Sequence, residues 1–311
     1  MRTLLVFNPF ATSTSETTKN HIVAELSKEL DLTLKPTSGR DEAIEIAHWA
    51  VQEQFDAIIG YGGDGTLNEI ANGLLRDGPN LNGPILGAIP GGNANVFARN
   101  LQFSSDPLQA TQKLITSIRN NNFRPIGIGH LSAPEVSRYF LFNSGIGVDA
   151  AVLAKMDQRR RRGKRVSDNM YTAIAIQKVL ETTAQRDVAI TLKTDTGDVH
   201  TDLKFALVIN LAPWIYIGER PVTLTPEATL DNALSIFAPS DLSLPGLFHL
   251  GRNIFGRKDP THNNRQVLLA DLNALELQSE KALWVQVDGE ALVKVTEVSM
   301  RHIPDALRVF V

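Results

Sequence analysis

The first third of the chain alternates strand-like runs with helical patterns, and this alternation constrains the fold most. Strand-like runs occupy residues 3–7, 32–36, 56–63 and 84–90. Between them, apolar side chains recur three or four positions apart, as they do on amphipathic helices. Apolar strands separated by amphipathic helices predict a parallel sheet covered by helices on both faces. We therefore expect an α/β domain at the N-terminus.

Local signals predict where two helices of this domain begin. Ser13 and Glu16 have the spacing of a capping box, which predicts a helix start at Ser13. Asp106 followed by Pro107 predicts a second N-terminus, because proline is favoured at the first helical position.

The pattern changes near residue 125. From there to residue 302 the chain consists mostly of short strand-like runs, such as 139–143, 205–211 and 283–287. Helical patterns interrupt them near 168–184 and 243–256. These runs predict a second, antiparallel β domain.

Composition excludes several classes of function. The 311 residues carry a net charge of −3 and include no cysteine, so disulfides and thiolate metal sites are excluded. The seven histidines form no H-x-x-x-H pair, which argues against a zinc site. The longest apolar stretch, 205–217, is interrupted by Asn210 and Pro213 and is too short to span a bilayer. A cytoplasmic setting fits these features.

Three polar or glycine-rich turns follow strands of the predicted parallel sheet, at residues 8–13, 62–66 and 90–95. Each precedes a helix, whose free N–H groups and positive dipole end favour an anion. Glycines let a backbone approach a phosphate closely. The turns therefore predict a polyphosphate site, although ordinary tight βα turns have the same composition.

Gly60, Gly62 and Gly65 match the dinucleotide fingerprint G-x-G-x-x-G, but the context does not fit it. That fingerprint requires an acidic residue about 20 positions later, and residues 79–86 contain none. Asp64, expected on an exposed turn, would repel a pyrophosphate unless a cation lay between them. Carboxylate and phosphate oxygens together favour Mg²⁺. The Walker pattern is absent as well.

Residues 62–69, GGDGTLNE, followed by Asn72 and Gly73, resemble the diacylglycerol kinase catalytic-domain family, which includes sphingosine kinases and bacterial soluble lipid kinases. The similarity continues at Asn8-Pro9, at Thr37, and in residues 90–99, 138–150 and 288–290. GGDGT alone also occurs in NAD kinases and phosphofructokinases. The following Asn-Glu and the late Asp-Gly-Glu favour lipid kinases.

The resemblance implies an ATP-binding α/β domain over residues 1–127, to which a last strand at 304–311 returns. It implies a lipid-binding antiparallel β-sandwich over residues 128–303. The residues that it assigns to ATP are Asn8, Pro9, Phe10, Ala11, Thr12, Thr37, Gly62, Gly63, Asp64, Gly65, Thr66, Leu67, Asn68, Glu69, Gly92, Asn93 and Asn95.

The resemblance also implies the catalytic groups. Glu290 would be the general base that takes the proton of a lipid hydroxyl, and Asp288 would assist it or the metal. Asp64 would hold Mg²⁺, with Asn232 as a weaker oxygen ligand. Taken alone, Asp288-Gly289 is also typical of a simple hairpin turn.

Two departures from the family concern the metal. Val96 and Gly127 stand where the family has carboxylates, so of three expected acidic ligands only Asp64 is left. We expect an active kinase with an altered metal shell, and an inactive relative is the alternative.

A basic run at residues 155–165 predicts contact with an anionic membrane surface through Arg159, Arg160, Arg161, Arg162, Lys164 and Arg165. A solvated helix end is the alternative. No aromatic residues interleave with the run, which argues against nucleic acid.

The resulting hypothesis is an ATP- and Mg²⁺-dependent lipid kinase of phospholipid biosynthesis, converting diacylglycerol to phosphatidic acid. It would be cytoplasmic and peripherally membrane-associated, and a homodimer is compatible with it. The alternatives are an NAD kinase-like small-molecule kinase and an inactive nucleotide- or lipid-sensing protein.

Overall fold

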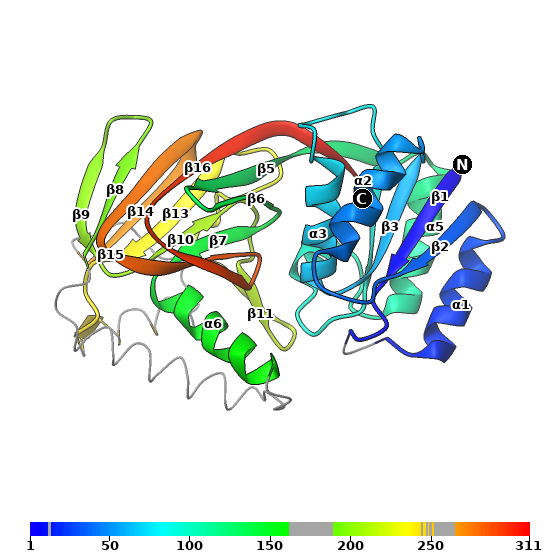
Figure 1. Ribbon diagram of the computed structural model, residues 1–311, viewed down its shortest axis with the longest axis horizontal. Helices are drawn as coiled ribbons and strands as arrows, with labels where there is room; N and C mark the ends of the chain where they lie inside the picture. Colours follow the sequence, from blue (N-terminus) through cyan, green and yellow to red (C-terminus); the bar gives the residue numbers. More distant parts are fainter. Residues whose placement is uncertain (12–13, 162–188, 244, 247, 249–250, 252–264) are drawn as a thin grey trace. The chain divides into compact units, whose positions relative to one another are not determined.

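The computed structural model describes residues 1–11, 14–161, 189–243, 245–246, 248, 251 and 265–311 (Figure 1). It divides into two compact units. Unit 1 comprises Met1–Ile128 and Ile303–Val311, and unit 2 comprises Gly129–His302. Two strands, β5 (Phe123–Ala133) and β16 (Glu290–Phe310), contain the points at which the chain passes from one unit to the other.

Unit 1 is built around a parallel sheet in the order β2–β1–β3–β4, to which the last residues of β16 add a strand. In that added strand, Val309 lies parallel beside Leu86. The other strands are β1 (Arg2–Phe7), β2 (Asp31–Pro36), β3 (Ala57–Gly62) and β4 (Ile85–Pro90). The predicted return of the last strand to the first domain is therefore confirmed.

The helices of unit 1 are α1 (Glu16–Leu26), α2 (Glu42–Gln52), α3 (Asp64–Leu74), α4 (Val96–Asn100) and α5 (Pro107–Arg119). Helix α2 packs beside α3, and α1 packs beside α5. In Figure 1 these two pairs lie on opposite sides of the sheet. All residues of β3 and β4 are buried, as expected for strands covered on both faces.

One predicted helix start is confirmed and the other is wrong. Asp106 caps α5, accepting a 2.8 Å hydrogen bond from the Leu108 N–H, with Pro107 at the first helical position. Helix α1 is capped instead by Ser15, whose hydroxyl accepts from the Thr18 N–H at 3.1 Å. Glu16 is thus the first helical residue and cannot complete a capping box. Ser13 lies outside the described residues.

Unit 2 is an antiparallel β unit with one principal helix, α6 (Val148–Arg161), among its described residues. Its main strand order is β14–β13–β10–β7–β15–β16. Strand β8 pairs with β15 and β9 pairs with β8, whereas β5 pairs with β16 and β6 pairs with β5. Its strands besides β5 and β16 are β6 (Val136–Phe140), β7 (Asn143–Ile146), β8 (Ile190–Thr194), β9 (Val199–Leu203), β10 (Ala206–Ile209), β11 (Ile215–Ile217), β12 (Arg220–Val222), β13 (Leu234–Pro239), β14 (Gln266–Leu272) and β15 (Ala274–Val287).

Strand β10 is buried on both faces, which explains its continuous apolar run. Val208 belongs to one hydrophobic cluster, whereas Leu207 and Ile209 belong to a second cluster that Val152 and Met156 of α6 complete. The α/β plus antiparallel β fold class is confirmed. The predicted helix near 168–184 lies wholly outside the described residues. The predicted helix near 243–256 lies largely outside them.

The run 139–143 was predicted as one strand, and this is wrong. Strand β6 ends at Phe140 and β7 begins at Asn143. The backbone N–H groups of residues 141–143 bind a side chain, the carboxylate of Asp288, in place of a neighbouring strand.

Gly73 sets how closely α2 and α3 approach. A Cβ atom at Gly73 would lie 2.2 Å from the carbonyl oxygen of Ile44 in α2. Gly65, in the same helix α3, is exposed, and a Cβ there would meet nothing within 4 Å. A substitution at Gly73 therefore tests helix packing, whereas the same substitution at Gly65 tests helix propensity.

We predict that Gly73→Ala lowers the free energy of unfolding by about 1–3 kcal/mol, because the added methyl group forces two packed helices apart. The matched control, Gly65→Ala, should stay within about 1 kcal/mol of the wild type, because alanine favours helix and meets no clash. Urea unfolding of both variants measures this. Equal midpoints for the two variants would contradict the packing argument.

Candidate active site

Three loops of unit 1 lie side by side at the C-terminal edge of its parallel sheet. They follow β1, β3 and β4, which are neighbours in the order β1–β3–β4. The Asn8 N–H donates to the Tyr61 carbonyl at 3.0 Å, and the Gly91 N–H donates to the Gly62 carbonyl at 2.8 Å. The three predicted turns are therefore brought together, at the sheet edge where ligands of open α/β folds bind.

Most glycines in these loops are required by the packing of one loop on another. A Cβ atom at Gly92 would lie 2.7 Å from the Cα atom of Gly63, and one at Gly62 would lie 2.6 Å from the Thr66 hydroxyl oxygen. A Cβ at Gly91 would lie 3.1 Å from the Cα of Gly62. Gly65 is different, because no atom of the described residues excludes a side chain there.

Asp64 is not on an exposed turn, contrary to the sequence expectation. It is the first residue of α3, and its carboxylate accepts a 3.0 Å hydrogen bond from the Phe97 N–H at the start of α4. Burial raises the pKa of Asp64, and backbone N–H donors of residues 95–97 offset part of that rise. The N-cap residue of α4, Asn95, makes no side-chain capping bond, so Asp64 supplies an acceptor that the helix end requires.

The loop after β1 is fixed by its own hydrogen bonds. The Asn8 Oδ1 atom accepts from the Phe10 N–H at 2.9 Å, which leaves the Phe10 side chain 80% exposed. Pro9 is exposed and Ala11 is partly exposed, whereas Thr12 lies outside the described residues. Thr37 is buried beside this loop, with its N–H donating to the Phe7 carbonyl at 2.9 Å.

Several predicted ATP residues have side chains that bind other parts of unit 1. Leu67 and Asn68 are buried, and Asn68 accepts a hydrogen bond from Asn72. Glu69 accepts from the N–H groups of Asp41 and Ala43 at the start of α2, at 3.0 and 3.2 Å. These side chains hold the loops in position.

The loop after β4 is closed in the same way. The Asn95 side chain bridges the N–H and carbonyl groups of Gly92, at 2.9 and 2.7 Å. Asn93, between them, is exposed.

In unit 2, Asp288 and Gly289 form the two-residue turn between β15 and β16. Their φ angles are 46° and 83°, as a type I′ hairpin requires. The buried Asp288 carboxylate accepts from the N–H groups of residues 141, 142 and 143, at 2.7, 3.0 and 3.0 Å. Three charge-assisted bonds anchor the turn. The contacts of Asp288 are therefore with backbone amides, and its predicted role beside the base remains a hypothesis.

Gln286, a buried residue, also stabilises this turn through hydrogen bonds. It is 1% exposed, its Oε1 atom accepts from the Gly289 N–H at 2.9 Å, and its Nε2 atom donates to Asn143 Oδ1 at 2.7 Å. Glu290, directly after the turn, keeps a side chain that is 19% exposed. Its carboxylate lies 4.0 Å from the guanidinium of Arg138 in β6. The turn thus presents an acid on a rigid support.

Asp149 is a further acid that the sequence analysis did not single out. It lies in the first turn of α6, and burial raises its pKa to about 6, although a hydrogen bond with Gln286 opposes the rise. Gln286 thereby connects Asp149 to the turn that carries Glu290. The sequence signal was its place at the end of the matching segment 138–150.

Metal ligands are sparse. Asn232 is exposed, and its side-chain nitrogen donates to the Glu227 carbonyl at 2.8 Å. Within the described part of the chain, no group of three or more His, Asp or Glu side chains is arranged to hold a metal ion. Val96, where the family has a carboxylate, is buried.

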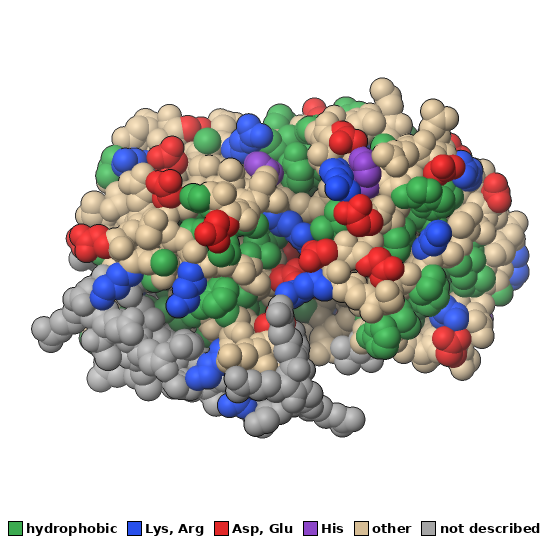
Figure 2. Space-filling view, viewed as in Figure 1, with side chains coloured by type: hydrophobic (Ala, Val, Ile, Leu, Met, Phe, Trp, Pro, Cys, Tyr) green, Lys and Arg blue, Asp and Glu red, His purple; other side chains and the backbone are tan. Residues whose placement is uncertain are grey.

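The predicted membrane contact can be followed only in part. Arg159 is partly buried near the end of α6; Arg162, Lys164 and Arg165 lie outside the described residues, as do the side chains of Arg160 and Arg161. On the face drawn in Figure 2, acidic and basic side chains are interspersed. No helix in the described ranges is long and apolar enough to cross a membrane.

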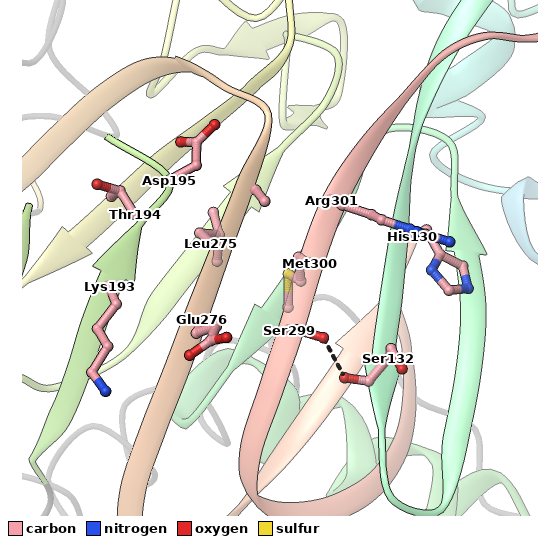
Figure 3. A pocket seen from close by; sticks show the side chains of 11 residues that line it. His130, Ser132, Lys193, Thr194, Asp195, Leu275, Glu276, Ser299, Met300 and Arg301 are labelled. Carbon is pink, nitrogen blue, oxygen red and sulfur yellow. Dashed lines mark hydrogen bonds between the residues drawn. The ribbon is translucent and has the colours of Figure 1, made fainter. Parts of the chain in front are cut away.

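Unit 2 also contains an open cavity of about 590 Å³ that none of the predicted site residues lines (Figure 3). Its floor is formed by Leu275 and Met300. Lys193, Glu276 and Arg301 surround it, so charges of both signs face it. This mixture selects no ligand class.

Comparisons with known proteins agree with this arrangement. Residues 2–130 match the model of the diacylglycerol kinase catalytic domain. A diacylglycerol kinase of Bacillus subtilis is 35% identical over 150 residues, 47% of this chain, so the match spans about half (46%) of that relative. A Staphylococcus carnosus protein, named provisionally as a lipid kinase, is 25% identical over 287 residues, 89% of this chain and 85% of its own.

Solved structures share the fold. A diacylglycerol kinase from Bacillus anthracis superposes with a TM-score of 0.72 at 21% identity, covering 99% of this chain and 96% of its own. An NAD kinase from Archaeoglobus fulgidus, in complex with ATP, gives 0.55 at 15% identity, covering 100% and 94%. The chain shares its two-domain fold with these solved structures. Its residues 2–130, less than half of the chain, match the diacylglycerol kinase catalytic domain, the family that the motifs predicted.

Asp149 yields a pH-dependent prediction. Its pKa is about 6 in the folded protein and near the ordinary value of 3.8 when unfolded, so between pH 4 and 6 the native state binds more protons. The contribution of Asp149 to wild-type stability should therefore fall across this window as pH rises, by at most about 3 kcal/mol. Asp149→Asn removes this term, so the stability of the variant relative to the wild type should rise from pH 4 to 6 and then level.

Urea unfolding of both proteins at several pH values measures the difference. If the difference in free energy of unfolding between the two proteins stayed constant from pH 4 to 7, the carboxyl of Asp149 would be ordinarily solvated.

Proposed function

We propose that the protein is an ATP- and Mg²⁺-dependent lipid kinase that transfers the γ-phosphate to a lipid hydroxyl, most directly that of diacylglycerol. In this proposal unit 1 binds ATP and unit 2 binds the lipid. The family match of residues 2–130 and the names of the relatives support a lipid kinase. Diacylglycerol is the substrate that the name of the Bacillus subtilis relative implies.

The observation that carries the proposal is Gly65. Packing accounts for Gly62, Gly91 and Gly92, but none of the residues that the structure describes requires a glycine at the exposed start of α3. Alanine would favour the helix there by up to about 1 kcal/mol. A glycine at a helix N-terminus, where free N–H groups attract anions, allows a phosphate to approach the backbone. We infer that the ATP phosphates lie against the Gly63–Thr66 turn.

Mg²⁺ fits this site only together with ATP. Asp64 supplies one carboxylate, which already accepts a backbone hydrogen bond but has further lone pairs. Mg²⁺ commonly binds one or two carboxylates together with substrate phosphates and water, so one acid is sufficient. When bound, the ion would neutralise charge on the transferred phosphoryl group. Asn232 is retained as a weaker oxygen ligand.

Glu290 is the proposed general base. Its position on a turn that Asp288 and Gln286 anchor provides the fixed geometry that phosphoryl transfer needs. A carboxylate there can orient a lipid hydroxyl and accept its proton as the oxygen attacks phosphorus. We assign Asp288 to positioning this base. The basic end of α6 remains the proposed contact with an anionic membrane.

An NAD kinase-like activity is the second candidate, favoured by the superposition with an NAD kinase. An inactive nucleotide- or lipid-sensing protein is the third, and the missing carboxylates at Val96 and Gly127 favour it.

We predict that Glu290→Gln lowers kcat for lipid phosphorylation by 10²- to 10⁴-fold, because an amide cannot accept the hydroxyl proton. ATP affinity should be nearly unchanged, because the proposed ATP residues lie in unit 1. Steady-state kinetics and ATP titration measure the two effects. The control is Asp288→Asn, which should lower stability by about 1.5–3 kcal/mol through a lost charged acceptor. Wild-type turnover in Glu290→Gln would place the base elsewhere.

We predict that Gly65→Ala weakens ATP binding at least tenfold, about 1.4 kcal/mol, because its methyl group occupies the space proposed for a phosphate. The unfolding midpoint of this variant should match that of the wild type, as argued above. Calorimetric titration with ATP and Mg²⁺ measures the affinity. Unaltered ATP affinity would remove the observation on which the phosphate site rests.

A further inference from the structure

Gln286 lies at the centre of a buried polar network beside the turn that carries Glu290. Its amide reaches Asp149 in the first turn of α6, the helix that packs against β15 and β7 (Figure 1). Its neighbours in the sheet are small, with Gly145 opposite it on β7 and Ala291 opposite it on β16. A Cβ atom at Gly145 would lie 3.1 Å from the Gln286 Nε2 atom. The sequence therefore leaves space for an amide at this place.

Three neighbouring groups fix the orientation of this amide. The Gly289 N–H can only donate, and it binds the Gln286 Oε1 atom at 2.9 Å. The Nε2 atom then faces two acceptors, Asn143 Oδ1 at 2.7 Å and the Asp149 carboxylate. If the amide of Gln286 rotated by 180°, Asn143 could turn its own amide to match, but an ionised carboxylate can only accept. Asp149 therefore favours the one orientation in which Gln286 accepts from the turn.

Stability alone does not explain a carboxylate at position 149. The partly buried Asp149 lies between Val148 and Val152 along α6, and both valines belong to the hydrophobic cluster that packs α6 on the sheet. Replacing buried charged groups with well-packed apolar side chains is often neutral or stabilising. A polar network whose members all have partners contributes something different, because it makes one arrangement of its groups unique. Here the group whose arrangement it fixes is the turn before Glu290.

We propose that Asp149 and Gln286 are positioning residues for phosphoryl transfer. Asp149 orients the amide of Gln286. The amide in turn holds the Gly289 N–H, and Glu290 is the next residue, so its carboxylate keeps a fixed direction. Asp288 anchors the preceding position of the same turn, so the turn is held at two successive residues. This inference rests on the proposed function, because it takes Glu290 as the base.

Alignment is the step of catalysis that such residues affect. Phosphoryl transfer depends mainly on the positions of its reacting groups and on charge neutralisation. A displacement of about 1 Å can lower the rate by about 100-fold. Loss of the network should therefore lower kcat and leave the affinity for ATP nearly unchanged, because the proposed ATP residues lie in unit 1.

A double-mutant cycle of Asp149→Leu and Glu290→Gln tests the inference. The measurement is transfer of label from ATP to dihexanoylglycerol, below its critical micelle concentration and at about pH 8, above the Asp149 pKa of about 6. We expect Asp149→Leu to lower kcat by about 10- to 100-fold. Asp149→Asn, whose amide oxygen can still accept from Gln286, should lose less. In the Glu290→Gln background, Asp149→Leu should change kcat by less than about twofold, because the base that it positions is already absent.

The matched control is Ser144→Ala. It removes a buried 2.7 Å hydrogen bond to the carbonyl of Gln286 and leaves the amide of that residue in place. It should lower the unfolding midpoint, whereas its kcat should stay within about twofold of the wild type. If Asp149→Leu does not fold, Gln286→Met, which fills a similar volume without a donor or an amide acceptor, enters the same cycle with the same expected results.

Three outcomes would contradict this inference alone, provided that the wild type labels lipid. They are wild-type kcat in Asp149→Leu, the same fold loss of kcat with and without Glu290→Gln, and a loss of kcat in Ser144→Ala as large as that in Asp149→Leu. The last two would show that any weakening of unit 2 lowers turnover. A wild type that labels no lipid would instead contradict the proposed function.

Discussion

Acidic side chains in this protein bind backbone N–H groups, and the geometry of the candidate residues within each unit depends on this interaction. Asp288 accepts from three consecutive amides, Glu69 accepts from two at the start of α2, and Asp64 accepts from one at the start of α4. Each bond replaces water at a strand or helix end whose donors lack a partner within their own helix or strand ladder. Because the acceptors are charged, the bonds are stronger than those between neutral groups.

This interaction distinguishes motif residues that stabilise the loops from motif residues that stay accessible. Asp64, Glu69 and Asp288 bind backbone amides, whereas Gly65 and Glu290 of the same motifs are exposed and partly exposed. A rigid support is what phosphoryl transfer requires, since its catalysis depends mainly on alignment and charge neutralisation. Loss of activity on mutating a motif acid therefore needs a stability measurement beside it before a chemical role is assigned.

Much of the fold could be predicted from the sequence because it rests on local periodicity. The run 3–7 matches β1 to within one residue, the run 84–90 contains β4, and Asp106-Pro107 begins α5. The errors arose where a distant side chain decides the local structure. The strand expected at 139–143 is divided because Asp288, about 145 positions away in sequence, binds its amides. The burial of Asp64 likewise depends on α4, and no nearby residue signals it.

The candidate site was predictable as a set of positions but not as a set of roles. Glycine spacing located the turn that we propose binds phosphate, yet it could not separate Gly92, which packing requires, from Gly65, where a side chain would meet none of the described residues. Asp149 was missed although it lies in the matching segment 138–150, because a lone acid in a helix has no spacing pattern of its own. Its hydrogen bond with Gln286 is what connects it to the turn that carries Glu290.

The most direct test of lipid kinase activity is transfer of label from [γ-³²P]ATP, with Mg²⁺ or with a chelator, to a panel containing diacylglycerol, other membrane lipids with a free hydroxyl, and NAD. The predicted result is a labelled lipid phosphomonoester, foremost phosphatidic acid, that appears only with Mg²⁺ and is absent with NAD. Label in NADP, or ATP binding without labelling of any lipid, would contradict the proposed function.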